Sequence, residues 1–265
     1  MAWSPDSTRL AVAQSDNIVF VYKLGLNWGD KKTICNKFQQ NSPVTSLTWP
    51  KSRPGELIFG LAEGKVKLGF LKNNKQATLY NADVYTVSVC ASPDGSGICS
   101  GHLDGSLFKF AFEDGSSAPS WTKFATHSSV PYALDWGHAC ICAGGADEKV
   151  ILYHELSGTV AREFDYTETE GVKAMTTAKF APSGQTLIVG NWNRFFIYGW
   201  NSRLEVWEEI SCKVIENLYS VTALAWKPDG SKLLTGGLCG VVDIYDACLR
   251  RFRYKGKFEF GVSLH

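Results

Sequence analysis

The feature that most constrains this chain is an internal repeat of about 45 residues. A turn motif, "WSPDS" at 3–7, returns as "ASPDG" at 91–95, "FAPSG" at 180–184 and "WKPDG" at 226–230. Two more copies keep the tryptophan and alter the turn, "TWPKSRPG" at 48–55 and "DWGHA" at 135–139. The residues before the turns are Trp3, Trp49, Ala91, Trp136, Phe180 and Trp226. Successive members of this series are 46, 42, 45, 44 and 46 residues apart. Such a period is typical of repeat architectures.

A second series has the same period. Short β-rich runs end at Tyr22, Gly69, Phe110, Tyr153, Tyr198 and Tyr245, spaced by 47, 41, 43, 45 and 47 residues. In the last full unit we predict four strands, in "CKVIENLY" (212–219), "SVTALAWK" (220–227), "KLLTGGL" (232–238) and "VVDIYD" (241–246). No window shows a helical period. Four strands in each unit predict an all-β fold, a WD40-type β-propeller with about six four-stranded blades. Another propeller class or a β-sandwich stays open, although a sandwich would not explain the period.

The repeat also predicts the division of the chain. We expect one propeller over 1–265, with units at about 1–31, 32–75, 76–117, 118–157, 158–205 and 206–248 and an outer strand at 249–260. The small residues of the third strands, as in "CAGGADE", fit crowded positions near a central channel. The acids of the turns before the fourth strands, Asp16, Glu63, Asp104 and Asp147, are predicted to be structural, as in WD repeats.

No sequence motif indicates catalysis, a cofactor or a metal. "FGLAEGKVK" at 59–67 has three residues between its glycines, and Val66 follows Lys65, so it does not match a phosphate-binding loop. "YHELSG" at 153–158 has Gly158 where a zinc protease needs its second histidine. The eight cysteines form no C-x-x-C pair, and we interpret them as small buried apolar residues of a reducing compartment. The net charge of +1 gives no general attraction to nucleic acid.

Two surface features are candidate contacts for a partner or a lipid. The run "CLRRFRYKGK" at 248–257 contains five cations and no acid, namely Arg250, Arg251, Arg253, Lys255 and Lys257. Strand alternation would place all of them except Arg250 on one face, as a basic patch for an acidic partner or an anionic lipid headgroup. The plainer interpretation is a solvated edge strand that its charge protects from aggregation. Trp28, in the polar segment "LGLNWGDKK" at 24–32, is a candidate anchor, or it folds back onto its own blade.

These residues resemble one family. The segments "SDNIVFVYKLGLNWGDKKTICNKF" (15–38), "FGLAEGKVKL" (59–68), "PYALDW" (131–136) and 217–259 are similar to the N-terminal propeller of the intraflagellar transport protein 172 family. The resemblance covers essentially the whole chain. Its most specific parts are "NWGDKK" and "LCGVVDIYDACLRR", because propeller geometry does not dictate them.

The resemblance implies a role and a setting. Family members are longer subunits of the intraflagellar transport B complex, which acts in ciliary transport and cilium assembly. The implied partners are other B-complex subunits and an anionic membrane surface, with no nucleic acid and no small-molecule substrate. The implied location is the cytoplasm and the cilium, at the axoneme and basal body. Alternatives are an adaptor of a vesicle coat, or an enzyme with a ligand in the propeller channel. The family also implies a seventh blade, so we expect an incomplete seven-bladed ring and a chain that is a fragment.

Overall fold

The computed structural model describes residues 1–25, 27, 29–113, 119–215, 220–248 and 251–259. They form two compact units, Met1–Pro131 and Tyr132–His265. Over the described residues, the strands make six antiparallel four-stranded sheets, three in each unit. The same residues contain no helix, and hence none that could span a membrane. The sheets are the blades of a WD40-type β-propeller, so the predicted fold class and blade number are confirmed.

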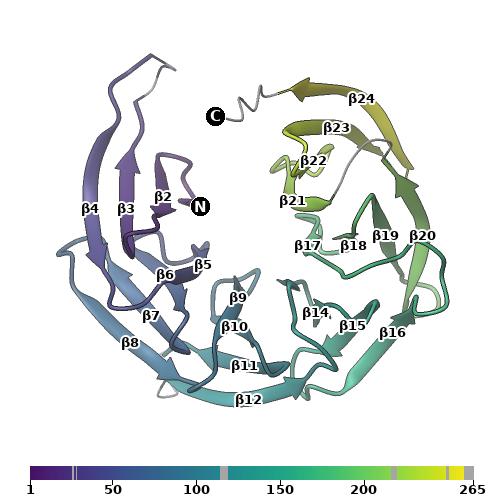
Figure 1. Cartoon of the computed structure of the whole chain (residues 1–265), viewed down its shortest axis with the longest axis horizontal. Helices are drawn as coiled ribbons and strands as arrows, with labels where there is room; N and C mark the ends of the chain where they lie inside the picture. The colour runs from purple at the N-terminus through teal and green to yellow at the C-terminus, as the bar shows by residue number, and fades with distance from the viewer. Residues whose placement is uncertain (26, 28, 114–118, 216–219, 249–250, 260–265) are drawn as a thin grey trace. The chain divides into compact units, whose positions relative to one another are not determined.

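Unit 1 contains blades 1 to 3. Blade 1 consists of β1 (Ala2–Trp3), β2 (Arg9–Ala13), β3 (Ile18–Lys23) and β4 (Thr33–Gln39). Blade 2 consists of β5 (Val44–Thr48), β6 (Glu56–Leu61), β7 (Lys65–Phe70) and β8 (Gln76–Asn81). Blade 3 consists of β9 (Thr86–Ala91), β10 (Gly97–His102), β11 (Ser106–Ala111) and β12 (Ser120–Thr126). In Figure 1 the fourth strands β4, β8 and β12 lie on the outer side of this unit.

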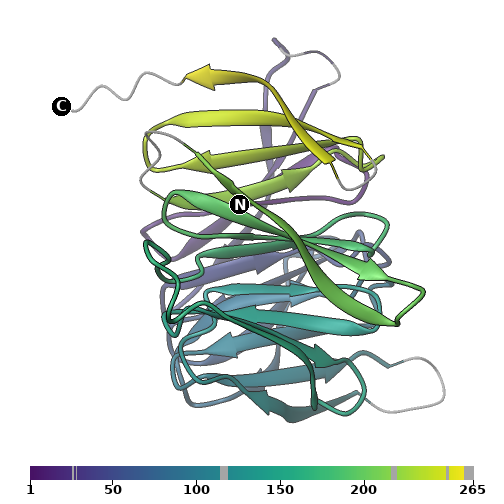
Figure 2. The ribbon, with the colours of Figure 1, turned by 90° about the vertical axis from the view of Figure 1, so that its right-hand side faces the viewer.

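Unit 2 contains blades 4 to 6. Blade 4 consists of β13 (Ala133–Trp136), β14 (Cys140–Gly144), β15 (Lys149–His154) and β16 (Val160–Asp165). Blade 5 consists of β17 (Thr177–Phe180), β18 (Thr186–Gly190), β19 (Arg194–Asn201) and β20 (Val206–Val214). Blade 6 consists of β21 (Val221–Trp226), β22 (Lys232–Gly237), β23 (Val241–Cys248) and β24 (Arg251–Glu259). Figure 2 shows β20 and β24 on the outer side of unit 2.

The recurring turn motif joins the first two strands of a blade. In the last copy Gly230 has φ = 72°, a conformation that glycine adopts without strain. The Asp229 carboxylate accepts hydrogen bonds from the backbone N–H and the hydroxyl of Ser231, at 2.9 and 2.6 Å. These bonds and the Lys227 ammonium hold the pKa of Asp229 below its ordinary value. The Pro-Asp-Gly sequence therefore fixes both the backbone and the side chain of the turn.

Blade 5 is apolar on both faces because it packs between blades 4 and 6. In β19, Phe196 and Tyr198 pack toward blade 4, whereas Phe195 and Ile197 pack toward blade 6. All four are at most 2% exposed. A strand buried on both faces gives a continuous apolar run, which is why the sequence "RFFIYGW" shows no alternation.

The predicted small residues lie on the second strands of the blades, because the third strand of each unit in the sequence is the second strand of a blade in the structure. A side chain added at Gly60 of β6 would meet the Thr86 methyl group at 2.6 Å and Val89 at 3.0 Å, both on β9 of the next blade. Glycine at this position therefore sets how closely blades 2 and 3 pack.

The fourth strand of every blade contains a β-bulge against the third. The residues that the registers skip are Cys35, Leu79, Phe124, Ala161, Ile210 and Lys255. A bulge shifts the alternation of side chains along the strand. One predicted strand was also misplaced, because β20 spans Val206–Val214 rather than 212–219, and residues 216–219 lie outside the described residues.

Candidate interaction surface

The predicted basic strand exists as β24, the outer strand of blade 6. It pairs with β23 so that Arg253 lies opposite Asp246 and Lys257 lies opposite Asp243. Asp243 and Asp246 are three residues apart on one strand, so they face opposite sides of the sheet. The prediction that Arg251, Arg253, Lys255 and Lys257 share one face is therefore wrong. The physical reason is the bulge at Lys255, which reverses the alternation beyond it.

Part of the charge of β24 is neutralised within the blade. The Lys255 ammonium lies 3.0 Å from one carboxylate oxygen of Asp246, and the Lys232 ammonium lies 2.7 Å from the other. The hydrogen bonds from Lys232 and Lys255 hold the pKa of Asp246 below its ordinary value. Lys255 is consequently less available to an external anion than the sequence suggested.

The rest of β24 is amphipathic. Phe252 is 8% exposed and packs edge to face against the Trp226 ring and the Phe195 ring. Tyr254 and Phe258 are 51% and 57% exposed. Arg253 and Lys257 are exposed as well. The strand therefore presents two cations and two aromatic rings to solvent.

Three of the predicted contact residues cannot be placed in this surface. Trp28 and Arg250 lie outside the described residues. The backbone of Arg251 belongs to β24, opposite Cys248, and its side chain lies outside the description. Their contact roles stay predictions.

The four turn acids lie between the second and third strands of their blades. These are the turns before the fourth strands of the sequence units, which begin one strand earlier than the blades do. The Asp16 carboxylate accepts a hydrogen bond from the backbone N–H of Ile18 at 3.2 Å, and that of Asp104 accepts one from Ser106 at 2.9 Å. Glu63 is ion-paired with Lys65 at 3.1 Å.

Burial acts to raise the pKa of Asp104, but its hydrogen bonds from Ser106 outweigh burial and hold this pKa below the ordinary value. Burial raises the pKa of Tyr153, and the nearby Asp147 carboxylate raises it further. These contacts support the structural role predicted for the turn acids.

A buried hydrogen-bonded chain is the arrangement in unit 1 that most resembles catalytic chemistry. Tyr80 Oη donates to Ser100 Oγ at 2.7 Å, and Ser100 Oγ lies 2.7 Å from His102 Nε2. His102 Nδ1 lies 2.8 Å from the Val84 carbonyl oxygen, which can only accept, so Nδ1 carries the proton.

This chain of hydrogen bonds joins blades 2 and 3 rather than forming a nucleophilic pair. Burial lowers the pKa of His102, so the ring is neutral and accepts from Ser100. Ser100 and His102 are 0% exposed and Tyr80 is 4% exposed, so no substrate reaches them. The sequence analysis missed this chain because Tyr80 and Ser100 are twenty residues apart on different blades. Among the described residues there is no group of three or more metal-ligating side chains.

Curated proteins named for intraflagellar transport match this chain over nearly its whole length. It is 51% identical over 98% of its length to "Intraflagellar transport protein 172" of Chlamydomonas reinhardtii and 47% identical over 98% to the homologue of Homo sapiens. It is 37% identical over 98% to "Intraflagellar transport protein osm-1" of Caenorhabditis elegans. The chain spans only 14–15% of the length of these relatives.

Two further comparisons concern the fold. A family model described as "Eukaryotic translation initiation factor eIF2A" matches residues 128–262. A chain from "Crystal Structure of Mitotic Checkpoint Complex" aligns with a TM-score of 0.77 and 16% identity, over 98% of this chain and 77% of that one. At that identity the likeness shows the fold alone. The curated relatives show that the chain belongs to the intraflagellar transport protein 172 family, and the family model shows that, through residues 128–262, it also belongs to the family described as eukaryotic translation initiation factor eIF2A.

Proposed function

We propose that this chain is a non-catalytic scaffold domain of intraflagellar transport. The observation that carries the proposal is its identity of 37–51% over 98% of the chain to relatives named for that process. The fold supports it, because a propeller offers rigid blade edges and turn surfaces for partner proteins. Neutral, fully buried Ser100 and His102 fit a structural use of groups that catalyse reactions elsewhere.

The finer role follows the family. The chain would act within a subunit of the intraflagellar transport B complex, in cilium assembly, at the axoneme and basal body and in the cytoplasm. Its partners would be other B-complex subunits, with an anionic membrane surface as a further contact. Arg253 and Lys257 are exposed on β24 and are the cations that we propose for such a contact.

A chimera tests the proposal. In Chlamydomonas cells that lack their own relative, we would express that relative with its matching segment replaced by this chain. The expected result is restored cilium assembly and co-purification of the chimera with B-complex subunits. The control is a chimera with Ile197→Asp, which places an unpaired charge at a position that is 0% exposed. A stable chimera that enters no transport particle would contradict the proposal.

A further inference from the structure

One end of blade 2 carries a concave basic site that the sequence did not suggest. The turn between β5 and β6 and the turn between β7 and β8 are joined by a hydrogen bond from Leu71 N–H to the Gly55 carbonyl at 2.9 Å. Together they border a cavity of about 520 Å³ lined by Ser52, Arg53, Gly55, Glu56, Phe70 and Lys72, here named the basic pocket. This volume lies in the range of sites that take a few side chains of a ligand.

Arg53 is held in place at the wall of the basic pocket. Its guanidinium lies 4.1 Å from the centre of the Phe112 ring and 2.9 Å from the Glu56 carboxylate. The side chain keeps 29% of its area exposed, so the group is fixed and still reachable. A fixed guanidinium loses little conformational entropy when it binds a carboxylate, and its planar N–H groups match that ligand.

The lysines around the basic pocket remain available. Lys51 and Lys72 are exposed, and across the described ranges no ion pair joins either of them to a carboxylate. Among the lining residues the sole acid is Glu56, which Arg53 engages. On β24, by contrast, Asp246 takes both Lys232 and Lys255. Positive charge at the basic pocket therefore exceeds the charge of its one acid.

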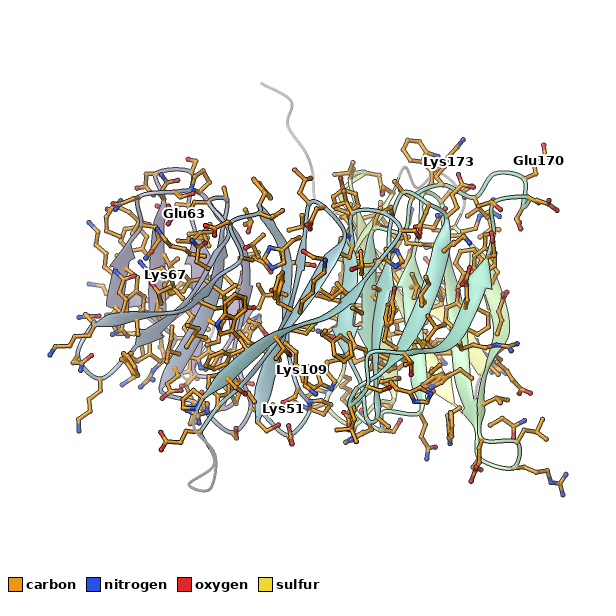
Figure 3. All side chains as sticks on the ribbon, turned by 90° about the horizontal axis from the view of Figure 1, so that it is seen from below. Lys51, Glu63, Lys67, Lys109, Glu170 and Lys173 are labelled. Carbon is orange, nitrogen blue, oxygen red and sulfur yellow. The ribbon has the colours of Figure 1, made fainter. Side chains whose placement is uncertain are left out.

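The opposite end of the same blade differs in charge. Figure 3 shows Lys51 and Glu63 at opposite ends of unit 1. Glu63 is ion-paired with Lys65, so that end balances its charge within the turn. A negatively charged partner that approaches blade 2 is therefore drawn to the end that carries Arg53 and Lys72.

We propose that the basic pocket binds a glutamate- or aspartate-rich segment of a partner protein, with carboxylates at Arg53 and Lys72. This deepens the proposed scaffold function and rests on it. The site is an open hollow bordered by two turns, which favours a peptide over a membrane because an extended chain can lie along the hollow, whereas a bilayer surface is broad. The half-buried Phe70 gives the methylene groups of glutamate side chains an apolar contact.

Fluorescence anisotropy with fluorescein-labelled octaglutamate tests the proposal on the whole chain. We expect binding that weakens with added salt, and no binding of octaglutamine. The double variant Arg53→Gln with Lys72→Gln is expected to bind octaglutamate about tenfold more weakly, because it loses charge-assisted hydrogen bonds. The matched variant Lys173→Gln with Arg203→Gln loses the same charge from exposed positions of unit 2 and is expected to bind like the unmodified chain.

Two further measurements keep the test decisive. Lys72→Glu changes an exposed side chain and keeps both partners of Arg53, so we expect it to fold with an unchanged melting temperature and to bind octaglutamate more weakly. Equal affinity of the unmodified chain and both basic-pocket variants would overturn the proposal. The proposal would also be overturned if the basic-pocket variants lost binding to phosphatidylserine vesicles while their binding to octaglutamate stayed unchanged. If the chimera restores cilia but the basic-pocket variants bind octaglutamate as tightly as the unmodified chain, the proposed site is wrong and the scaffold function stands. If the chimera fails but the variants bind octaglutamate more weakly, the site binds acidic peptides and the scaffold function is wrong.

Discussion

Blades 5 and 6 have the same strand pattern in unit 2, yet one face of each is buried to different degrees. The registers make Ile188, Phe195 and Ile197 of blade 5 equivalent to Leu234, Val242 and Ile244 of blade 6. The three residues of blade 5 are 0% exposed, because blade 6 packs on them. Their equivalents in blade 6 are all partly exposed. The two blades thus have the same pattern of apolar residues on this face, but only the face of blade 5 is buried by another blade.

The space around two equivalent glycines also differs between blades 5 and 6. A side chain added at Gly190 would meet the Thr177 methyl group of its own blade at 2.7 Å and Val221 of blade 6 at 2.9 Å. At the equivalent Gly236 the nearest atoms belong to Val242 and Ala223 of the same blade, at 3.7 and 3.8 Å. The position of Gly236 in blade 6 is therefore less crowded than the equivalent position of Gly190 in blade 5. The seventh blade that the family implies stays a prediction.

The largest expected effect comes from removing side-chain volume on the two faces. Ile197→Ala leaves a cavity between blades 5 and 6, and we expect it to lower the free energy of unfolding by about 3 kcal/mol. Ile244→Ala removes the same atoms from a partly exposed position and should cost about 1 kcal/mol, since part of the side chain already contacts water. Urea unfolding of the two variants, followed by tryptophan fluorescence, measures the difference.

Equal losses for Ile197→Ala and Ile244→Ala would break the comparison, because they would mean that something covers blade 6 in solution. A second copy of the chain is the simplest such cover. Sedimentation velocity on the unmodified chain would then identify it.

A smaller effect is expected where a side chain is added. Gly190→Ala must displace Thr177 and Val221, and overpacking of this kind costs about 1–3 kcal/mol. Gly236→Ala meets ordinary contacts only, and it reduces the freedom of the unfolded chain, so we expect a change between zero and about 1 kcal/mol of stabilisation. The same urea titrations apply. A loss of stability in Gly236→Ala that matched the loss in Gly190→Ala would show the space around Gly236 to be filled.

The repeat made most of the fold predictable, because turn chemistry and strand order are local. The Pro-Asp-Gly sequence determines the turn at 228–230 independently of which strands the flanking residues pair with. The residues that the registers skip are not local in this sense. Lys255 lies in the alternating run "RFRYKGK", and only pairing with β23 decides that it is the bulged residue.

The candidate sites were harder to predict for the same reason. Arg53 and Lys72 lie nineteen residues apart in the sequence, in two turns that no charge run marks. They line one cavity because the β5–β6 and β7–β8 turns of an antiparallel sheet lie at the same end of the blade. The run at 248–257 attracted attention through its composition, although Asp246, on the partner strand, engages one of its cations.

The smallest expected effect concerns two acids of β23 that face opposite sides of blade 6. Burial raises the pKa of Asp243 above its ordinary value of 3.8, and Lys257 only partly opposes this. The charged form therefore costs stability at neutral pH, and the cost disappears below the ordinary pKa. For Asp246 the hydrogen bonds from Lys232 and Lys255 lower the pKa, so its charge contributes stability above 3.8 that is lost as pH falls through the lowered pKa.

Asn substitutions separate these two acids. At about pH 7, Asp243→Asn is expected to raise the urea midpoint and Asp246→Asn to lower it, each by less than either alanine substitution in blade 5. At about pH 3 Asp243→Asn should approach the unmodified chain, because the Asp243 carboxyl is then largely protonated in both the folded and the unfolded state, whereas the deficit of Asp246→Asn should persist until the pH falls below the lowered pKa of Asp246. If Asp243→Asn lowered the midpoint at pH 7, the carboxylate would be satisfied by a contact on the side facing blade 5. Blade 6 would then be joined to blade 5 by a polar contact at the position where Phe196 packs blade 5 onto blade 4.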